Sequence, residues 1–181
     1  MSYMRIVLTK ILPHESRVLY LDCDIIVDKN IEDVFDYDIS NVAIAGCRET
    51  YSCHPNKQQI NTGFLYMNLE YMRKHKTDDL LVYYSCRRQV ENGDQSIINL
   101  LPRTELLDLP VEFNGTGICV GLYDKDNMPR TRHFAGFYPD EYIYDFAPYF
   151  KKYLNQTILT PAQRRHQKAN ACSTEQWRKL R

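Results

Sequence analysis

Two aspartates stand one residue apart at the end of an apolar run, in the stretch VLYLDCDIIV (residues 18–27). A buried carboxylate is unfavourable unless a cation or hydrogen-bond donors compensate its charge. If the run is a strand, Asp22 and Asp24 project to one face and Cys23 to the other. Ligands of open α/β sheets collect beyond the carboxyl ends of the strands. Two oxygen donors there predict a partial site for a hard divalent cation, which would also hold a phosphate.

The D-x-D spacing alone is a weak signal, because a chain with 14 aspartates should contain the pattern by chance. It recurs at Asp36 and Asp38 and again at Asp124 and Asp126. Both of those pairs lie in polar segments, where solvated carboxylates need no explanation. Among the three pairs, only the one in DCD ends a buried apolar run, and this context favours a functional role.

Two enzyme classes use such a pair. Dehalogenase-like phosphatases place a nucleophilic and an acid/base aspartate there and need a later acidic pair, for which Asp78 and Asp79 are the candidates. That pair falls within an expected helix, where a solvated face is the simpler interpretation. The second class is the nucleotide-sugar glycosyltransferases.

The elements that must position these residues alternate between strands and helices. This alternation predicts an α/β domain with a mainly parallel or mixed sheet. Strands are expected at residues 17–27, 41–47 and 61–69, and a strand leading into a loop at residues 104–114. Helices are expected at residues 3–13, 70–93, 94–102 and 143–156, and a short helix with a loop at residues 30–40.

The bulk composition is that of a soluble globular domain. The chain has 181 residues, of which 44% are hydrophobic and 25% charged, and no run approaches the roughly 18 apolar residues of a membrane span. The N-terminus lacks a secretory layout. The six cysteines are scattered without a CxxC pair, which favours reduced thiols and a cytoplasmic location.

The net charge of zero conceals a polarity. Residues 151–181 carry eight Lys or Arg and one acid, whereas residues 1–150 carry 15 bases and 22 acids. A basic tail with aromatic residues predicts peripheral contact with an anionic membrane surface, at the inner face of the plasma membrane. The alternative is a solvated, partly disordered terminus. We expect no nucleic-acid partner.

Four motifs in order resemble glycosyltransferase family 8, which includes bacterial lipopolysaccharide glucosyl- and galactosyltransferases and glycogenin. They are LYLDCDIIV, NTGFLYMNL, NGDQSIIN and HFAG, and the similarity runs from about Arg5 to about Gly136. The resemblance implies a GT-A type nucleotide-diphospho-sugar transferase fold, a mixed sheet flanked by helices, that is truncated at its N-terminal side. Residues 1–150 would be the C-terminal portion of that domain and residues 151–181 a basic helical or disordered tail.

The same resemblance implies roles for individual residues. Asp22, Asp24 and His133 would bind Mn²⁺, or Mg²⁺ in its place, and Mn²⁺ accepts both carboxylate and imidazole ligands. Asp94 would accept hydrogen bonds from sugar hydroxyls, and Gln95 would lie near the anomeric carbon; these two are the candidate catalytic residues. Substrate contacts are implied for Arg5, Asp22, Asn61, Gly63, Asp94, Gln95 and Gly136.

The reaction implied is transfer of glucose or galactose from a UDP-sugar to a glycan or lipid-linked saccharide, with retention at the anomeric carbon and dependence on Mn²⁺. Two departures from the family pattern support an alternative, a non-catalytic remnant or partial subunit. Pro139 stands where family members carry a diphosphate-binding lysine, and only 17 residues precede Val18, where members have the strands that hold uracil and ribose. A dehalogenase-type phosphatase is a third, weaker alternative.

Overall fold

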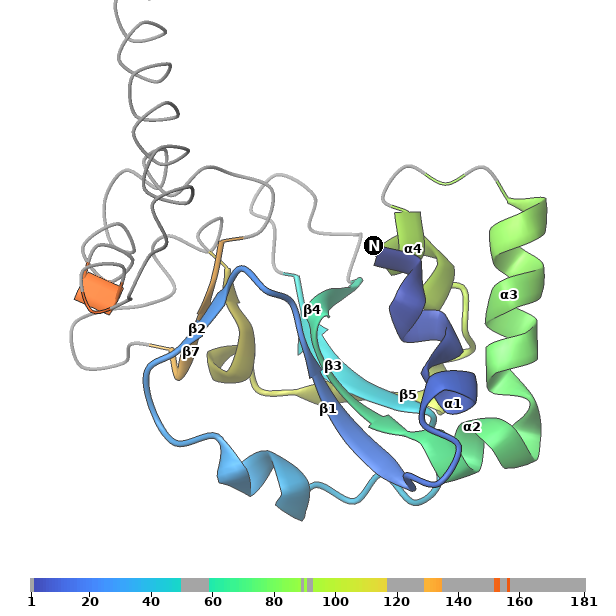
Figure 1. Cartoon of the computed structure of the whole chain (residues 1–181), viewed down its shortest axis with the longest axis horizontal. Helices are drawn as coiled ribbons and strands as arrows, with labels where there is room; N and C mark the ends of the chain where they lie inside the picture. The colour runs from blue at the N-terminus through green and yellow to red at the C-terminus, as the bar shows by residue number, and fades with distance from the viewer. Residues whose placement is uncertain are drawn as a thin grey trace, which may run out of the picture. The chain divides into compact units, whose positions relative to one another are not determined.

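The structure, a computed structural model, describes residues 2–49, 59–88, 90, 93–116, 129–134, 152–153 and 156. The chain divides into two compact units, Met1–Ala135 and Gly136–Arg181. All the helices and strands described below belong to the first unit (Figure 1).

A four-stranded mixed sheet forms the centre of this unit, in the order β1-β4-β3-β5. Its strands are β1 (Arg17–Leu21), β3 (Ile44–Arg48), β4 (Ile60–Asn68) and β5 (Leu106–Leu109). β4 pairs antiparallel with both β1 and β3, while β3 and β5 are parallel. The expected mixed sheet of an α/β fold is therefore present.

Both faces of this sheet are buried, and alternate residues of β4 show how. Leu65 and Met67 belong to one apolar cluster, and Phe64 and Tyr66 belong to another on the opposite face. This is the period of two that a strand imposes on its side chains. A strand covered on both faces reads as a continuous apolar run, as the sequence of β4 does.

Helices cover the face to which Leu65 and Met67 point (Figure 1). They are α1 (Leu8–Ile11), α2 (Leu69–His75), α3 (Thr77–Arg87) and α4 (Gly93–Ile98), with the 3₁₀ segment η1 (Ser2–Val7) before α1. α2 begins where the side chain of Asn68 accepts a hydrogen bond from the backbone N–H of Tyr71 at 2.9 Å, which caps the helix.

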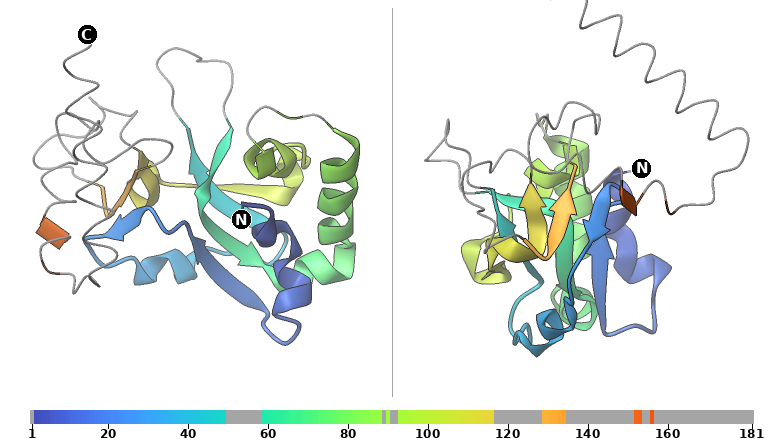
Figure 2. Two further views of the ribbon diagram at one scale, coloured as in Figure 1. Left: turned by 45° about the horizontal axis from the view of Figure 1, so that its top comes forward. Right: turned by 90° about the vertical axis from the view of Figure 1, so that its left-hand side faces the viewer.

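A small second sheet has the order β2-β7-β6, and its strands lie side by side in the second view of Figure 2. It consists of β2 (Ile25–Val27), β6 (Gly115–Thr116) and β7 (Thr131–His133). The opposite face of the large sheet packs against η2 (Glu32–Asp36) and η4 (Val111–Asn114) through Val34 and Phe113. A further 3₁₀ segment, η3 (Arg103–Glu105), precedes β5.

The expected strand at residues 17–27 is wrong in one respect, because the structure divides it. β1 ends at Leu21 and β2 starts at Ile25 in the other sheet, with a turn between them in which the N–H of Ile25 donates to the carbonyl of Asp22 at 3.2 Å. Asp22 and Asp24 thus lie in a turn rather than on one face of a strand.

The expected helix at residues 70–93 is also divided. Lys76 adopts a left-handed conformation with φ of 57°, so α2 ends at His75 and α3 ends at Arg87, before Gly93. The interpretation of Asp78 as a solvated residue was wrong. Its side chain is buried and accepts hydrogen bonds from Thr9 and Lys10, which joins α3 to α1.

Among the residues that the structure describes, no helix combines the length and the apolar character needed to cross a membrane. The expected helix at residues 143–156 lies outside the described residues, apart from a few positions at its end.

Candidate functional site

Asp22, Asp24 and His133 come together where β1 ends and β7 ends. One ligand atom from each lies within 4.8 Å of the other two. Nε2 of His133 is 3.3 Å from Oδ1 of Asp24 and 3.9 Å from Oδ2 of Asp22. The register of β2 with β7 explains the meeting, because Ile25 pairs with His133 and Asp24 precedes Ile25.

This donor set fits a divalent cation of the Mn²⁺ or Mg²⁺ type. Two carboxylates and one imidazole suit Mn²⁺, whereas Mg²⁺ accepts the carboxylates more readily than the imidazole. The imidazole of His133 is buried, whereas 42% of the Asp24 side chain is exposed, so within the described part of the chain the site is accessible from the side of Asp24. The hydrogen bond with His133 holds the pKa of Asp24 below its usual value, which keeps this carboxylate ionised.

Asp22 is held in place through one of its two oxygens. Oδ1 accepts hydrogen bonds from Nη2 of Arg5 at 2.9 Å and from the hydroxyl of Tyr20 at 2.7 Å. Burial and this hydrogen bond raise the pKa of Tyr20 to about 12, so the phenol stays protonated and can donate. The guanidinium of Arg5 lies 4.5 Å from the centre of the Tyr20 ring. Oδ2 of Asp22 is the oxygen that faces His133.

Arg5 is a buried link between two candidate site residues. Its Nε is 2.6 Å from Oδ2 of Asp94, and its Nη1 donates to the backbone carbonyl of Thr62. Burial raises the pKa of Asp94 and the charge of Arg5 opposes that rise. Arg5 is buried, and its guanidinium bridges Asp22 and Asp94.

α4 presents Asp94 and Gln95 at its first turn. It begins at Gly93, whose φ of +54° is a left-handed conformation that favours glycine. Oε1 of Gln95 accepts from the backbone N–H of Thr62 at 3.3 Å. Gln95 therefore contacts the start of β4, the strand that carries Asn61, and Asp94 is joined to the same strand through Arg5.

Asn61 and Gly63 make contacts within the site that the sequence did not indicate. Oδ1 of Asn61 accepts from the N–H of Gly63 at 2.9 Å and from Nδ2 of Asn114 at 2.8 Å. Oδ1 of Asn114 lies 2.9 Å from Nδ1 of His133. The imidazole of His133 lies where a Cβ on Gly63 would stand, and the expected contact of Gly63 with a substrate stays a prediction.

Three residues of this site escaped sequence reasoning: Tyr20, Glu49 and Asn114. Glu49 is buried and its carboxylate accepts from Nδ2 of Asn61 at 2.5 Å and from Nε2 of Gln95 at 3.0 Å. It directly follows the buried strand β3, which is the same signal that singled out Asp22 after β1. Asn114 ends a short 3₁₀ segment and carries no such signal.

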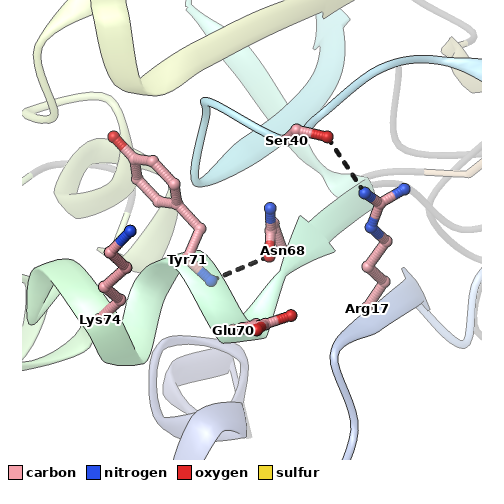
Figure 3. A pocket seen from close by; sticks show the side chains of 6 residues that line it. All are labelled: Arg17, Ser40, Asn68, Glu70, Tyr71 and Lys74. Carbon is pink, nitrogen blue, oxygen red and sulfur yellow. Dashed lines mark hydrogen bonds between the residues drawn. The ribbon is translucent and has the colours of Figure 1, made fainter.

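A polar hollow of about 250 Å³ lies at the other end of β1 and β4. Figure 3 shows its lining, which is Arg17, Ser40, Asn68, Glu70, Tyr71 and Lys74. The register places it away from the site, since Arg17 pairs with Asn68 at one end and Leu21 with Phe64 at the other. None of the predicted site residues lines it.

The remaining predictions fall on residues outside the described part of the chain. Gly136, Pro139, Asp124, Asp126 and the tail at residues 157–181 are among them. Their expected roles stay predictions.

Comparison with known proteins agrees with this geometry. Residues 1–135 match the description of glycosyl transferase family 8. Glycosyltransferase GlyF of Streptococcus pneumoniae serotype 4 is 29% identical over 144 residues, which is 74% of this chain and 36% of that protein. Glycosyltransferase GlyB of the same strain is 32% identical over 144 residues, covering 71% and 35%. The chain thus spans about a third of the length of these relatives.

Solved structures support the fold. The galactosyltransferase LgtC, solved with donor and acceptor sugar analogues, superposes with a TM-score of 0.72 at 19% identity, over 91% of this chain and 70% of that one. This likeness identifies a GT-A type α/β fold, as the sequence predicted. With the family match over residues 1–135, it leads to one conclusion: this chain belongs to glycosyl transferase family 8.

Proposed function

We propose that this chain carries the donor-sugar site of a metal-dependent hexosyltransferase that acts with retention. The donor would be UDP-glucose or UDP-galactose, and the acceptor a glycan or lipid-linked saccharide. One observation carries the proposal: ligand atoms of Asp22, Asp24 and His133 lie within 4.8 Å of one another, and Arg5 pairs with both Asp22 and Asp94. Membership of the family supports the reaction class.

The residues around the cation ligands have chemistry suited to a sugar. Asp94 is a buried carboxylate that accepts hydrogen bonds, and sugar hydroxyls donate them. Gln95 offers an amide oxygen that can stabilise positive charge at an anomeric carbon as the donor bond breaks. A bound divalent cation would supply Lewis-acid stabilisation of charge on the departing diphosphate.

The test is release of UDP by the purified chain from UDP-glucose and UDP-galactose, with MnCl₂ and with EDTA. We expect release that needs Mn²⁺ and is lost in Asp22→Asn/Asp24→Asn. The matched control is Asp36→Asn/Asp38→Asn, the same spacing on an exposed segment, which should leave release unchanged. Release that survives EDTA or the first double substitution would refute the proposal.

The non-catalytic alternative predicts a different result in the same assay. Its supporting observation is Pro139, at a position where the family resemblance implies a lysine. A chain that binds Mn²⁺ and UDP-sugar by calorimetry but releases no UDP would be a binding module or partial subunit. Where turnover occurs, NMR of the product's anomeric proton distinguishes retention from inversion.

We also propose peripheral attachment of the basic tail at residues 151–181 to an anionic membrane, on the cytoplasmic side. The support is its charge of eight Lys or Arg against one acid, together with Trp177 and several apolar residues. Each basic residue near an anionic leaflet contributes about 1 kcal/mol.

A further inference from the structure

Glu49 accepts a hydrogen bond from the candidate catalytic amide of Gln95, yet it has no place in the proposed reaction. Its exposed fraction is 7%. The two carboxylate oxygens have different partners: Oε1 accepts from Nδ2 of Asn61 at 2.5 Å, and Oε2 accepts from Nε2 of Gln95 at 3.0 Å. Glu49 therefore joins the first turn of α4 to the start of β4.

An ionised carboxylate accepts hydrogen bonds and donates none. Each amide must turn its NH₂ group toward Glu49, and each amide oxygen must then point away. The backbone agrees with this orientation, because Gly63 N–H donates to Oδ1 of Asn61 at 2.9 Å and Thr62 N–H donates to Oε1 of Gln95 at 3.3 Å.

The orientation of Asn61 has a consequence two residues further along the hydrogen-bond chain. Oδ1 of Asn61 accepts from Nδ2 of Asn114, so Oδ1 of Asn114 is the atom that faces Nδ1 of His133 at 2.9 Å. A carbonyl oxygen only accepts, and Nδ1 of His133 must therefore carry a proton. Nε2 is then the nitrogen that faces Asp22 and Asp24, and its lone pair would become available when a cation displaces the proton that it shares with Asp24.

We propose that Glu49 is a positioning residue, which fixes the amide orientations of Asn61 and Gln95 and, through Asn61 and Asn114, the protonation of Nδ1 in His133. The importance of Gln95 and His133 rests on the proposed function, but the order of the hydrogen bonds does not. A ligand histidine whose second nitrogen donates to a fixed acceptor is oriented for metal binding.

The experiment uses the full chain, metal-free at pH 8 and labelled with ¹⁵N. Two-bond ¹H–¹⁵N correlation distinguishes protonated from unprotonated ring nitrogens, and the signals of His133 are those lost in His133→Gln. We expect Nδ1 to carry a proton in the wild type. The side-chain NH₂ of Gln95, assigned with Gln95→Ala, should show the shift of an amide bound to a carboxylate. An unprotonated Nδ1 in the wild type would overturn the proposal.

Glu49→Gln presents an NH₂ group to a pair of donors, so one contact must break. Either the unprotonated fraction of Nδ1 rises or the Gln95 NH₂ signals move. Glu49→Ala removes the acceptor from both amides, should change both reporters, and also serves if the glutamine variant does not fold. The proposal fails if a folded variant leaves both reporters unchanged.

A rescue and a control isolate the path of the effect. Asn114→Asp in the Glu49→Ala background places a carboxylate directly against Nδ1 and should restore its proton. Glu105→Gln is the matched control, because Glu105 accepts from Tyr71 at 3.1 Å outside the site. It should move neither reporter, and failure of the rescue would show that the effect does not pass through Asn114.

Calorimetry with MnCl₂ gives a second readout. Loss of such supporting hydrogen bonds lowers metal affinity by about 10-fold to 100-fold. We expect a loss of about 10-fold for Glu49→Gln and no change for Glu105→Gln. Equal Mn²⁺ affinity in Glu49→Gln and wild type would show that Glu49 does not influence metal binding. If the wild type binds no Mn²⁺ at all, the proposed function fails, while the ring-nitrogen result still decides the role of Glu49.

Discussion

His133 occupies the space that a side chain at residue 63 would need. A Cβ on Gly63 would lie 2.1 Å from Cε1 and 2.6 Å from Nδ1 of the imidazole. Both residues are buried, and Nδ1 already faces Asn114, so the ring has little freedom to withdraw. Residue 63, in the NTG motif, must therefore be glycine for His133, in the distant HFAG motif, to keep this position.

Gly63→Ala should displace His133 and weaken Mn²⁺ binding by about 10-fold or more, with about 1–3 kcal/mol lost from the free energy of unfolding through overpacking. Calorimetry and denaturant unfolding measure the two effects. Gly46→Ala is the matched control, because its Cβ would lie 2.5 Å from Ile60 in the core. It should lose stability without losing Mn²⁺ affinity; equal affinity losses would show that packing alone is responsible.

Arg5→Met should lower the free energy of unfolding by about 3 kcal/mol at pH 7, the effect of removing one partner of a buried ion pair. Arg5 opposes the rise in the pKa of Asp94 that burial causes, so without Arg5 this pKa rises further. A raised pKa in the folded state means that stability falls as pH rises from the unfolded value to the folded one. The deficit should therefore be large at pH 7 and small near pH 4.

Urea unfolding of both proteins at pH 4 and pH 7 measures this difference. Arg17→Met is the control, since Arg17 is exposed and its hydrogen bonds to Tyr66 and Ser40 are long, at 3.5 and 3.3 Å. A deficit that is equal at the two pH values would contradict the assigned coupling.

Asp78→Asn should destabilise the contact between α1 and α3 by about 1–3 kcal/mol at pH 7. Burial raises the pKa of Asp78, but hydrogen bonds from Thr9 and Lys10 outweigh it and lower the pKa below its usual value. A lowered folded pKa gives stability that is present above the unfolded value and is lost as pH falls through the folded value. The difference from wild type should therefore vanish below about pH 3.

Asp79→Asn is the matched control, because Asp79 also contacts Lys10 but is exposed. Thermal unfolding followed from pH 2.5 to pH 7 should show a much smaller effect for Asp79→Asn at every pH. Equal effects of the two substitutions would mean that the buried contact with Thr9 contributes nothing.

The tail proposal is tested by co-sedimentation with vesicles of neutral and of anionic lipid. The full chain should bind anionic vesicles at low salt and release them as salt rises, because surface charge attraction is screened within about 10 Å at 0.1 M. A chain that ends at Gln156 should bind more weakly. Equal sedimentation of the two chains would leave the tail without this role.

Sequence reasoning succeeded where a local signal marks the position. Asp22 and Asp24 end an apolar run, and the start of α4 is marked by the glycine that precedes Asp94. Sequence reasoning failed where apolar character indicates that a strand is buried but not which sheet the strand joins. The run from Val18 to Val27 gives no sign that β1 and β2 enter different sheets, because both strands are apolar in sequence although the structure buries them only partly.

Other features had no signal of their own in the sequence. Lys76 takes a left-handed conformation that lysine does not favour, so tertiary packing determines the break between α2 and α3. The meeting of Asn114 with His133 and Asn61 depends on pairing between distant segments. Glu49 did carry a signal, a carboxylate after a buried strand, and only comparison with Asp22 reveals it.

The turn at Asp22–Asp24 joins the two sheets, and the candidate ligands come from both. Asp22 follows β1 of the large sheet, whereas His133 ends β7 of the small one. A cation held by these residues would act as a crosslink, and its binding energy would be thermodynamically linked to folding. At a free ion concentration 100 times the Kd, this linkage adds about 2.7 kcal/mol to the stability of the folded state. Hydrogen exchange from the three-residue strands β2 and β7 would slow accordingly, so the small sheet would report the presence of the ion.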